Sequence, residues 1–286
     1  MTGKLSLQTE TKLGLLFEWF RDKACVVAFS GGVDSSVLAK ALIVAYERSL
    51  LKIRPVGFFA ESFTSTELEK TDAQRVASEI GLPLVVLASK EFDDPQFVAN
   101  TPKRCYWCKK IRFSSIKELA QRDYGDPNGA EVTVVDGSNL SDLGDYRPGV
   151  QAANEVGVKS PLAEVGLIKS EIREIARFWN ISVAEKPSTP CLATRLTYNM
   201  PLSNEALRQV ENAELAVKSL GFTTCRARID APKTVRIELL ENEIKDLINS
   251  EKRKKIVVLL RELGFNFISL DLEGFFSGKN NRALSE

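Results

Sequence analysis

The chain has 286 residues, of which 44% are hydrophobic and 27% charged, with 39 basic against 38 acidic side chains. This length and composition predict one large α/β domain with a smaller one and ample core. The net charge of +1 provides no overall field for a polyanion, so a nucleic-acid substrate is not favoured, although a local basic groove stays open. No stretch reaches the roughly 18 to 20 apolar residues of a membrane span, and Met1–Thr11 lacks a signal peptide's apolar centre, so we expect a cytoplasmic protein without membrane contact.

Composition also limits the available side-chain chemistry. Histidine is absent, so proton transfer and metal binding must use cysteine, carboxylate, lysine, tyrosine or water. The five cysteines are an odd number in a chain that we expect to be cytosolic. They therefore argue against a disulfide framework and for thiol or metal chemistry.

Apolar residues at helical spacing predict a first helix over residues 6–22, and strand and helix patterns alternate after it. The expected strands cover residues 24–29, 55–60, 84–88 and 132–136, and the helices that follow the first three cover residues 33–46, 66–80 and 109–122. This alternation predicts an α/β fold with a doubly wound parallel sheet and helices on both faces. A ligand is then expected at the carboxyl ends of the strands.

An apolar helical stripe from Ile168 to Trp179 is expected to close the first domain. A loop with three prolines follows it, and we place the domain boundary at about Leu202, which gives domains of residues 1–202 and 203–286. The second is expected to be a small α+β domain. Its expected elements are a helix over 204–220, strands over 224–230 and 234–240, a helix over 241–263 and a strand over 266–272.

The most informative segment, Phe-Ser-Gly-Gly-Val-Asp-Ser-Ser at residues 29–36, follows the first strand and opens a helix. A strand, a glycine turn and a helix start in this order make an anion site, because backbone N–H groups and the positive helix end point into the turn. A Walker A loop is excluded, since the Gly-Lys-Ser/Thr ending is missing. The alternative is a capped helix after a glycine turn, without a ligand.

The pattern Ser-Gly-Gly-Val-Asp-Ser resembles the PP-loop of ATP pyrophosphatases, which split ATP between the α and β phosphates and pass AMP to a substrate oxygen. The resemblance implies ATP and Mg²⁺ as cofactors, with Asp34 as a magnesium ligand. It also implies that two glycines let the backbone approach the pyrophosphate and that three serines hydrogen-bond its oxygens. These residues are Gly31, Gly32, Ser30, Ser35 and Ser36.

Cys105 and Cys108 lie three residues apart at what reads as a helix start. This spacing puts both sulfurs on one helix face, and the helix dipole and the flanking basic residues favour their thiolates. Far along the chain, Cys191 follows prolines that hold it in an extended loop. We therefore expect Cys191 to be exposed and positioned for chemistry.

Cys25 and Cys225 fit a structural role, because each lies among inward-facing apolar residues of an expected strand. Three thiols remain, and a 4Fe-4S cluster ligated by Cys105, Cys108 and Cys191 would keep one iron open for an exogenous sulfide. Two alternatives stay open. One is a Cys-x-x-Cys redox pair with Cys191 unrelated, and the other is a zinc site completed by a carboxylate or water.

Several segments together resemble the LarE family, the ATP-dependent sulfur insertases that build the nickel-pincer nucleotide cofactor of lactate racemase. The resemblance spans nearly the whole chain and is far more specific than the PP-loop alone. The segments are residues 30–36, 136–139 through Asp142 to 145–149, 160–162, 169–173, 187–195 and 271–275.

The resemblance implies a substrate, pyridinium-3,5-biscarboxylic acid mononucleotide, whose carboxylates are activated by AMP and converted to thiocarboxylates. Some family members sacrifice the sulfur of the cysteine equivalent to Cys191. This chain resembles instead the three-cysteine subgroup, in which a 4Fe-4S cluster is thought to carry a non-core sulfide, so we expect Asp34, Cys105, Cys108 and Cys191 to be catalytic. The resemblance further implies that Asn139 belongs to the ATP site and that the protein forms a homo-oligomer, a hexamer in family members.

Four charged residues are substrate-binding candidates. Arg226 and Arg228 alternate along an expected strand, so they share one face and can clamp a phosphate. Glu214 shares an inward helical stripe and needs a cationic partner, for which these arginines are the nearest candidates. The resemblance assigns all three to the substrate phosphate or its surroundings; the alternative is a surface ion-pair cluster or subunit contact. Arg195 could either bind a substrate carboxylate or anchor its loop. Lys169 could touch a phosphate, but a lysine at a helix start is usually just solvated.

Two other functions stay open. A tRNA-thiolating PP-loop enzyme also joins ATP to a cysteine-bound cluster, but it would need an RNA-binding domain or a strongly basic face, which the near-neutral charge does not favour. A non-catalytic nucleotide or iron-sulfur sensor would bind ATP without releasing pyrophosphate. A pyrophosphate assay with the candidate dicarboxylate therefore separates these classes.

Overall fold

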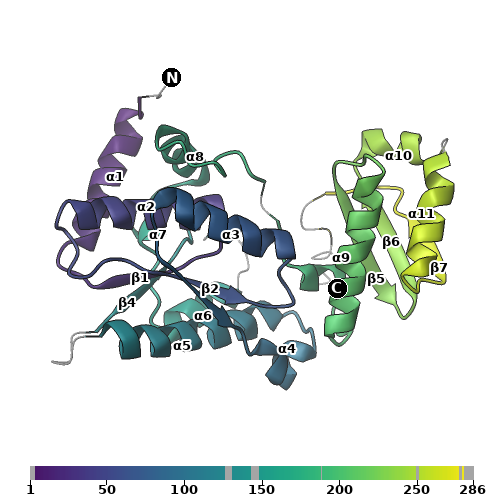
Figure 1. The fold of residues 1–286 in the computed structure, drawn as a ribbon, viewed down its shortest axis with the longest axis horizontal. Helices are drawn as coiled ribbons and strands as arrows, with labels where there is room; N and C mark the ends of the chain where they lie inside the picture. The colour runs from purple at the N-terminus through teal and green to yellow at the C-terminus, as the bar shows by residue number, and fades with distance from the viewer. Residues whose placement is uncertain are drawn as a thin grey trace. The chain divides into compact units, whose positions relative to one another are not determined.

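The computed structural model describes residues 4–125, 131–142, 148–187, 189–248, 251–276 and 279 (Figure 1). Four residues of the segments singled out above, Asp145, Tyr146, Arg147 and Ser188, lie outside the described residues. The chain divides into two compact units. The first comprises Met1–Ser62, Glu67–Asp94 and Cys105–Thr189, and the second comprises Phe63–Thr66, Pro95–Arg104 and Pro190–Glu286.

The first unit is built on a four-stranded sheet with the strand order β3-β2-β1-β4, and all its neighbouring strands are parallel. The strands are β1 (Cys25–Ala28), β2 (Gly57–Glu61), β3 (Leu84–Ala88) and β4 (Thr133–Asp136). The helices are α1 (Leu7–Phe20), α2 (Val33–Glu47), α3 (Glu67–Ile80), α5 (Arg104–Tyr124), α6 (Pro148–Val156), α7 (Pro161–Glu164) and α8 (Lys169–Phe178). The predicted α/β fold with a parallel sheet is confirmed.

Both faces of this sheet are covered by helices. Cys25 and Val27 of β1 pack into a core with α1, α2, α3 and α8, whereas Val26 between them packs into a second core with α5 and α6. Figure 1 shows α2 and α3 on one side of the strands and α5 and α6 on the other. Because successive side chains of a strand point to opposite faces, a strand buried on both faces is apolar throughout. This explains the unbroken apolar run of β1.

Three helices of the first unit differ from the expectation. Helix α5 begins at Arg104 rather than near residue 109, because the Arg104 N–H donates to the Thr101 carbonyl directly after Pro102 and Lys103 turn the chain. Cys105 and Cys108 therefore lie in its first turns. The short helices α6 and α7 were not expected at all. Nine and four residues are too few to show a clear helical period.

The second unit is built on a mixed three-stranded sheet with the order β5-β6-β7, antiparallel between β5 and β6 and parallel between β6 and β7. The strands are β5 (Cys225–Ala231), β6 (Thr234–Leu239) and β7 (Phe267–Leu270). The helices are α4 (Pro95–Val98), α9 (Asn204–Ser219), α10 (Glu241–Ile248) and α11 (Glu251–Glu262), so the stretch expected as one helix over 241–263 holds two. No helix within the described residues has the length and apolar character that a bilayer span requires.

The chain passes into the second unit at Pro190, before the boundary placed at Leu202. The reason is a contact along the outer edge of β5. Leu196 forms a bridge with Ile229, and the Thr197 N–H donates to the Ile229 carbonyl at 3.3 Å. The segment that carries Cys191 is therefore part of the second unit, whereas a proline-rich stretch looks like a linker in the sequence.

The glycine turn after β1 generates a stability prediction. Gly31 has a φ of 70°, and a Cβ there would lie 2.7 Å from the Ala73 Cα, so Gly31→Ala should lower the free energy of unfolding by about 1–3 kcal/mol. Gly14 lies in α1, and a Cβ added to it would have no described atom within 4 Å, so Gly14→Ala should raise that free energy by about 0.5–1 kcal/mol. Urea unfolding of both variants measures the difference. Equal effects of the two changes would contradict this account.

Candidate active site

The glycine turn lies at the carboxyl end of β1 and leads into α2. Gly32 is the N-cap residue of α2, and the hydroxyl groups around it hold the turn together. The Ser30 and Ser35 Oγ atoms lie 3.0 Å apart, and Ser35 and Ser36 both donate to the Gly32 carbonyl, at 3.1 and 2.8 Å. The residues predicted to surround a phosphate chain thus form one compact turn at the start of a helix, where anions are stabilised.

The carboxylate of Asp34, in the first turn of α2, is held by two side chains from other segments. Lys169 forms an ion pair with Asp34 Oδ2, and Asn139 Nδ2 donates to Asp34 Oδ1 at 3.3 Å. Asn139 also donates to Asp142, at 2.9 Å. The expectation of a merely solvated Lys169 was therefore wrong, because the start of α8 brings its ammonium group to the glycine turn. The signal was present in the segment 169–173, which the family resemblance includes.

A second polar cluster lies at the end of β4. Asp136 is 5% exposed and accepts hydrogen bonds from the hydroxyl groups of Ser138 at 2.8 Å and Ser160 at 2.7 Å. The ammonium group of Lys109, on α5, lies 3.5 Å from Asp136 Oδ2. Sequence reasoning assigned no role in this site to Lys109. Lys109 lies one helix turn after Cys105, so in the sequence it reads as a basic neighbour of the cysteines. Its contact with Asp136 at the end of β4 depends on the tertiary structure.

Two of the five cysteines are fully buried. Cys25 and Cys225 are both 0% exposed, as expected for core residues. Burial raises the pKa of the Cys25 thiol to about 12, and burial also raises the pKa of the Cys225 thiol. Both therefore stay protonated at neutral pH and are poor ligands and nucleophiles.

The other three cysteines are more accessible. Cys105 is exposed, and Cys108 and Cys191 are half-buried. Cys105 and Cys108 belong to the first unit and Cys191 to the second. Within the part of the chain that the structure describes, no three His, Cys, Asp or Glu residues lie close enough together to hold a metal ion.

Cys191 directly precedes the short helix η3 (Leu192–Arg195), and Arg195 at the end of η3 is 2% exposed. Its Nε donates to Glu214 Oε1 at 2.7 Å and its Nη2 to Glu214 Oε2 at 3.4 Å. Glu214 was expected to pair with Arg226 or Arg228. The structure gives it Arg195 as its close partner, since Arg226 Nη1 lies 3.9 Å away.

The two arginines of β5 differ in how their charge is neutralised. Arg228 is 6% exposed, and it donates to Glu238 at 2.6 Å and to the Thr194 carbonyl at 2.7 Å. Arg226 is half-buried and lies over the ring of Phe275 at 5.0 Å. Burial, and after it the like charge of Arg195, lowers the pKa of the Arg226 guanidinium. An anion bound here would therefore stabilise the charge of Arg226 more than that of Arg195 or Arg228, which already have close carboxylate partners.

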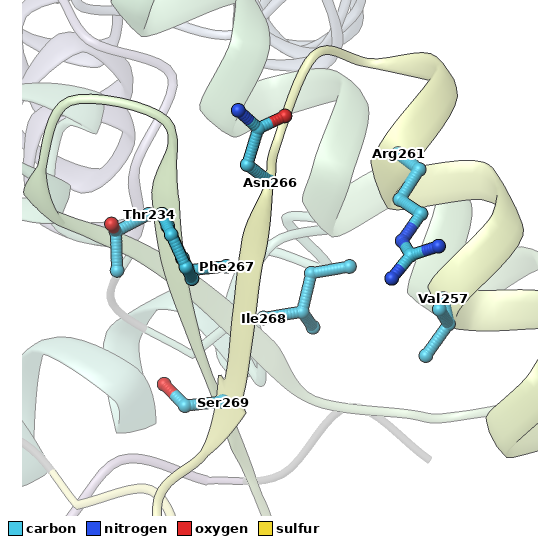
Figure 2. A pocket seen from close by; sticks show the side chains of 7 residues that line it. All are labelled: Thr234, Val257, Arg261, Asn266, Phe267, Ile268 and Ser269. Atoms are coloured by element: carbon cyan, nitrogen blue, oxygen red, sulfur yellow. The ribbon is translucent and has the colours of Figure 1, made fainter.

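A further pocket in the second unit lies between β7 and α11. Ile268 of β7 points toward Val257 and Arg261 of α11, while Phe267 and Ser269 point to the other side of the strand (Figure 2). None of the candidate site residues lines this pocket. It therefore contributes nothing to the chemistry considered above.

Comparisons with known proteins bear on this site. No family model matches the chain. An uncharacterized protein of Synechocystis sp. is 36% identical over 281 residues, 97% of this chain and 99% of that protein. A pyridinium-3,5-bisthiocarboxylic acid mononucleotide synthase of Lactiplantibacillus plantarum is 32% identical over 277 residues, 96% of each chain. A tRNA-specific 2-thiouridylase of Geobacter metallireducens is 31% identical over 195 residues, 57% of this chain and 53% of that protein.

The similarity to the synthase of L. plantarum extends over both units, whereas the similarity to the thiouridylase is partial. We conclude that this chain belongs to the family of pyridinium-3,5-bisthiocarboxylic acid mononucleotide synthases, the LarE family, within the PP-loop class of sulfur-transfer enzymes.

Proposed function

We propose that this protein adenylates the carboxylates of pyridinium-3,5-biscarboxylic acid mononucleotide with ATP and converts them to thiocarboxylates for the nickel-pincer nucleotide cofactor. The observation that carries the proposal is the grouping of Asp34, Lys169 and Asn139 at the glycine turn of a chain in this family. A carboxylate is a poor electrophile because its oxygen is a poor leaving group. Adenylation makes AMP the leaving group before sulfide attacks the carbonyl carbon, and pyrophosphate departs in the first step.

The chain's own groups suit each part of the adenylation step. The turn at Ser30–Ser36 would hold the β and γ phosphates through the N-terminus of α2. Asp34 would bind Mg²⁺, which stabilises charge on the departing pyrophosphate. Lys169 would then leave Asp34 and pair with a phosphate oxygen, so that both charges keep a partner.

For the sulfur step we propose a 4Fe-4S cluster on Cys105, Cys108 and Cys191. The type and number of donors suit such a cluster, because three accessible thiols in a chain without histidine would leave one iron open for the sulfide that is transferred. The proposal requires these cysteines to come together, since no three such residues lie within metal-binding distance among the described residues. Arg104, directly before Cys105, is 3% exposed, and its Nε has no acceptor among the described residues. An anionic group close to Cys105 would therefore be stabilised there.

Hydrogen bonds hold Arg104 within the second unit. Asn100 accepts a hydrogen bond from Arg104 at 2.6 Å and donates to the carbonyls of Thr197 and Met200. The residue before Cys105 is thus fixed within the same unit as Cys191. Sacrifice of the Cys191 sulfur remains the competing route.

Substrate phosphate is assigned to the second unit. We propose Arg226 as its main contact, with Arg228, Glu214 and Arg195 forming its surroundings. A homo-oligomer, a hexamer by family resemblance, belongs to the same proposal, and light scattering of the purified protein tests it.

The runner-up function is tRNA thiolation, which is favoured by the partial similarity to a tRNA-specific 2-thiouridylase. That enzyme is matched over only 53% of its length, so much of it has no counterpart here. An assay with pyridinium dicarboxylate and tRNA as competing acceptors separates the two. A nucleotide or iron-sulfur sensor would release pyrophosphate with neither.

The nucleotide site generates a kinetic prediction. Asp34→Ala should abolish substrate-dependent pyrophosphate release without unfolding the protein, because it removes the proposed magnesium ligand and little core volume. Lys169→Met should lower kcat on the order of tenfold to a hundredfold. The matched control is Lys186→Met, which removes a comparable ion pair with Asp72 in the same unit. Normal pyrophosphate release by the Asp34 variant would remove this residue from the mechanism.

The two arginines of β5 should respond differently to truncation. Arg226→Ala should weaken substrate binding by about 1.5–3 kcal/mol in calorimetry and leave ATP binding unchanged. Arg228→Ala should also weaken it, and it removes one of the two guanidinium partners of the buried Glu238, which keeps Arg236 at 3.0 Å, so it should cost about 1.5–3 kcal/mol of stability in urea. Unchanged substrate affinity of the Arg226 variant, together with loss of the oligomer, would favour a subunit contact instead.

The proposed cluster makes a prediction for four of the cysteines. Changing Cys105, Cys108 or Cys191 to alanine should each remove the iron and the catalytic sulfur transfer from anaerobically purified protein, whereas Cys25→Ala should keep both. Iron and sulfide analysis and the visible spectrum measure this. Two results would contradict the proposal: a brown, active Cys105→Ala protein, or a wild-type chain that loses the mass of one sulfur from Cys191 after a single turnover.

A further inference from the structure

The guanidinium of Arg195 donates in two directions, to Glu214 on one side and to the segment around Cys191 on the other. Nε and Nη2 face the carboxylate of Glu214. Nη1 donates to the Pro190 carbonyl at 3.0 Å and the Thr194 hydroxyl at 2.8 Å, and it lies 3.4 Å from the Cys191 carbonyl. The side chain therefore links Glu214 with the backbone on both sides of Cys191.

Glu214 is a rigid support for this link. It is 6% exposed on the inward face of α9, and its Oε1 also accepts the Ala227 N–H of β5 at 3.2 Å. An edge strand leaves such N–H groups without a strand partner, so Glu214 satisfies one of them. One carboxylate thus joins α9, the edge of β5 and the Cys191 segment.

The backbone at Cys191 is held by more than one donor. Its carbonyl accepts the Thr194 N–H at 3.0 Å and the Thr194 hydroxyl at 2.7 Å, in addition to the contact from Arg195. The next residue, Leu192, donates its N–H to the Thr64 carbonyl at 2.9 Å, within the same unit. These bonds fix the direction in which the Cα–Cβ bond of Cys191 points, while its side chain stays half-buried.

We propose that Arg195, held by Glu214 and assisted by Thr194, is a positioning residue that fixes Cys191 for sulfur chemistry and is not a ligand of the substrate. This rests on the proposed function, in which Cys191 takes part in sulfur transfer. Binding a substrate carboxylate with Arg195 would break a buried ion pair, which is strongly unfavourable. Arg226, which has no carboxylate closer than 3.9 Å among the described residues, carries no such penalty.

Two substitutions separate positioning from substrate binding. Arg195→Lys keeps a positive charge beside Glu214 but loses the fork that reaches the Pro190 and Cys191 carbonyls. Thr194→Val keeps the Arg195–Glu214 pair and removes the hydroxyl, so it tests the proposal even where the Arg195 variant folds poorly. The matched control is Thr197→Val in the same segment, whose hydroxyl bonds the exposed Asp230.

Steady-state kinetics provides the first measurement. In Arg195→Lys and Thr194→Val, kcat for sulfur transfer should fall on the order of tenfold or more, because reacting groups are misplaced, while KM for the pyridinium substrate stays within about twofold. Thr197→Val should behave as wild type. A raised KM at unchanged kcat would identify Arg195 as a substrate ligand and overturn the proposal.

A nitroxide label on Cys191 provides the second measurement and does not depend on enzyme activity. In a Cys105→Ser/Cys108→Ser background, its electron paramagnetic resonance spectrum should be immobilised, and it should become mobile with Arg195→Lys or Thr194→Val. Equal mobility in all variants would refute the positioning role. If the wild-type enzyme transfers no sulfur, the proposed function fails, and the label still decides whether Cys191 is held.

Discussion

Two glycines allow the main chain to approach itself at the active-site end of the first unit, and the arrangement of the other groups depends on that approach. A Cβ at Gly31 would lie 2.7 Å from the Ala73 Cα, and one at Gly137 would lie 2.7 Å from the Ser35 nitrogen. The segment after β4 therefore lies directly against the start of α2. Asp34 precedes Ser35 and Asn139 follows Gly137 closely, so their hydrogen bond depends on this contact.

Two carboxylates at this end of the sheet each have a lysine beside them. Asp34 pairs with Lys169, and Asp136 has Lys109 at 3.5 Å. Under the proposed function, a bound nucleotide brings both a polyphosphate and a divalent cation. The lysines can then pair with phosphate and a carboxylate with the cation, so the charge balance of the site is kept while its partners change.

In the second unit, burial and pairing separate three arginines that look equivalent in the sequence. Arg195 and Arg228 are both less than a tenth exposed, and each uses a carboxylate to compensate its desolvation. Arg226 lies over an aromatic ring, and among the described residues its nearest carboxylate is 3.9 Å away. The first two therefore stabilise the unit around Cys191, and Arg226 has the most weakly compensated charge of the three, which under the proposed function would pair with the anionic substrate.

The sequence by itself determines three features: the alternation of strands and helices, the glycine turn after the first strand, and the core position of Cys25 and Cys225. Each of them follows from a local pattern of apolar and small residues. It contains no direct signal for strand order, and it misses α6 and α7, whose patterns are too short. Only the tertiary structure decides that Lys169 pairs with Asp34, which lies 135 residues earlier in the sequence. The same holds for the ion pair between Arg195 and Glu214, which are 19 residues apart. The physical reason is that an ion pair depends on which side chains packing brings within a few ångströms, and the spacing of charges along the chain does not encode that distance.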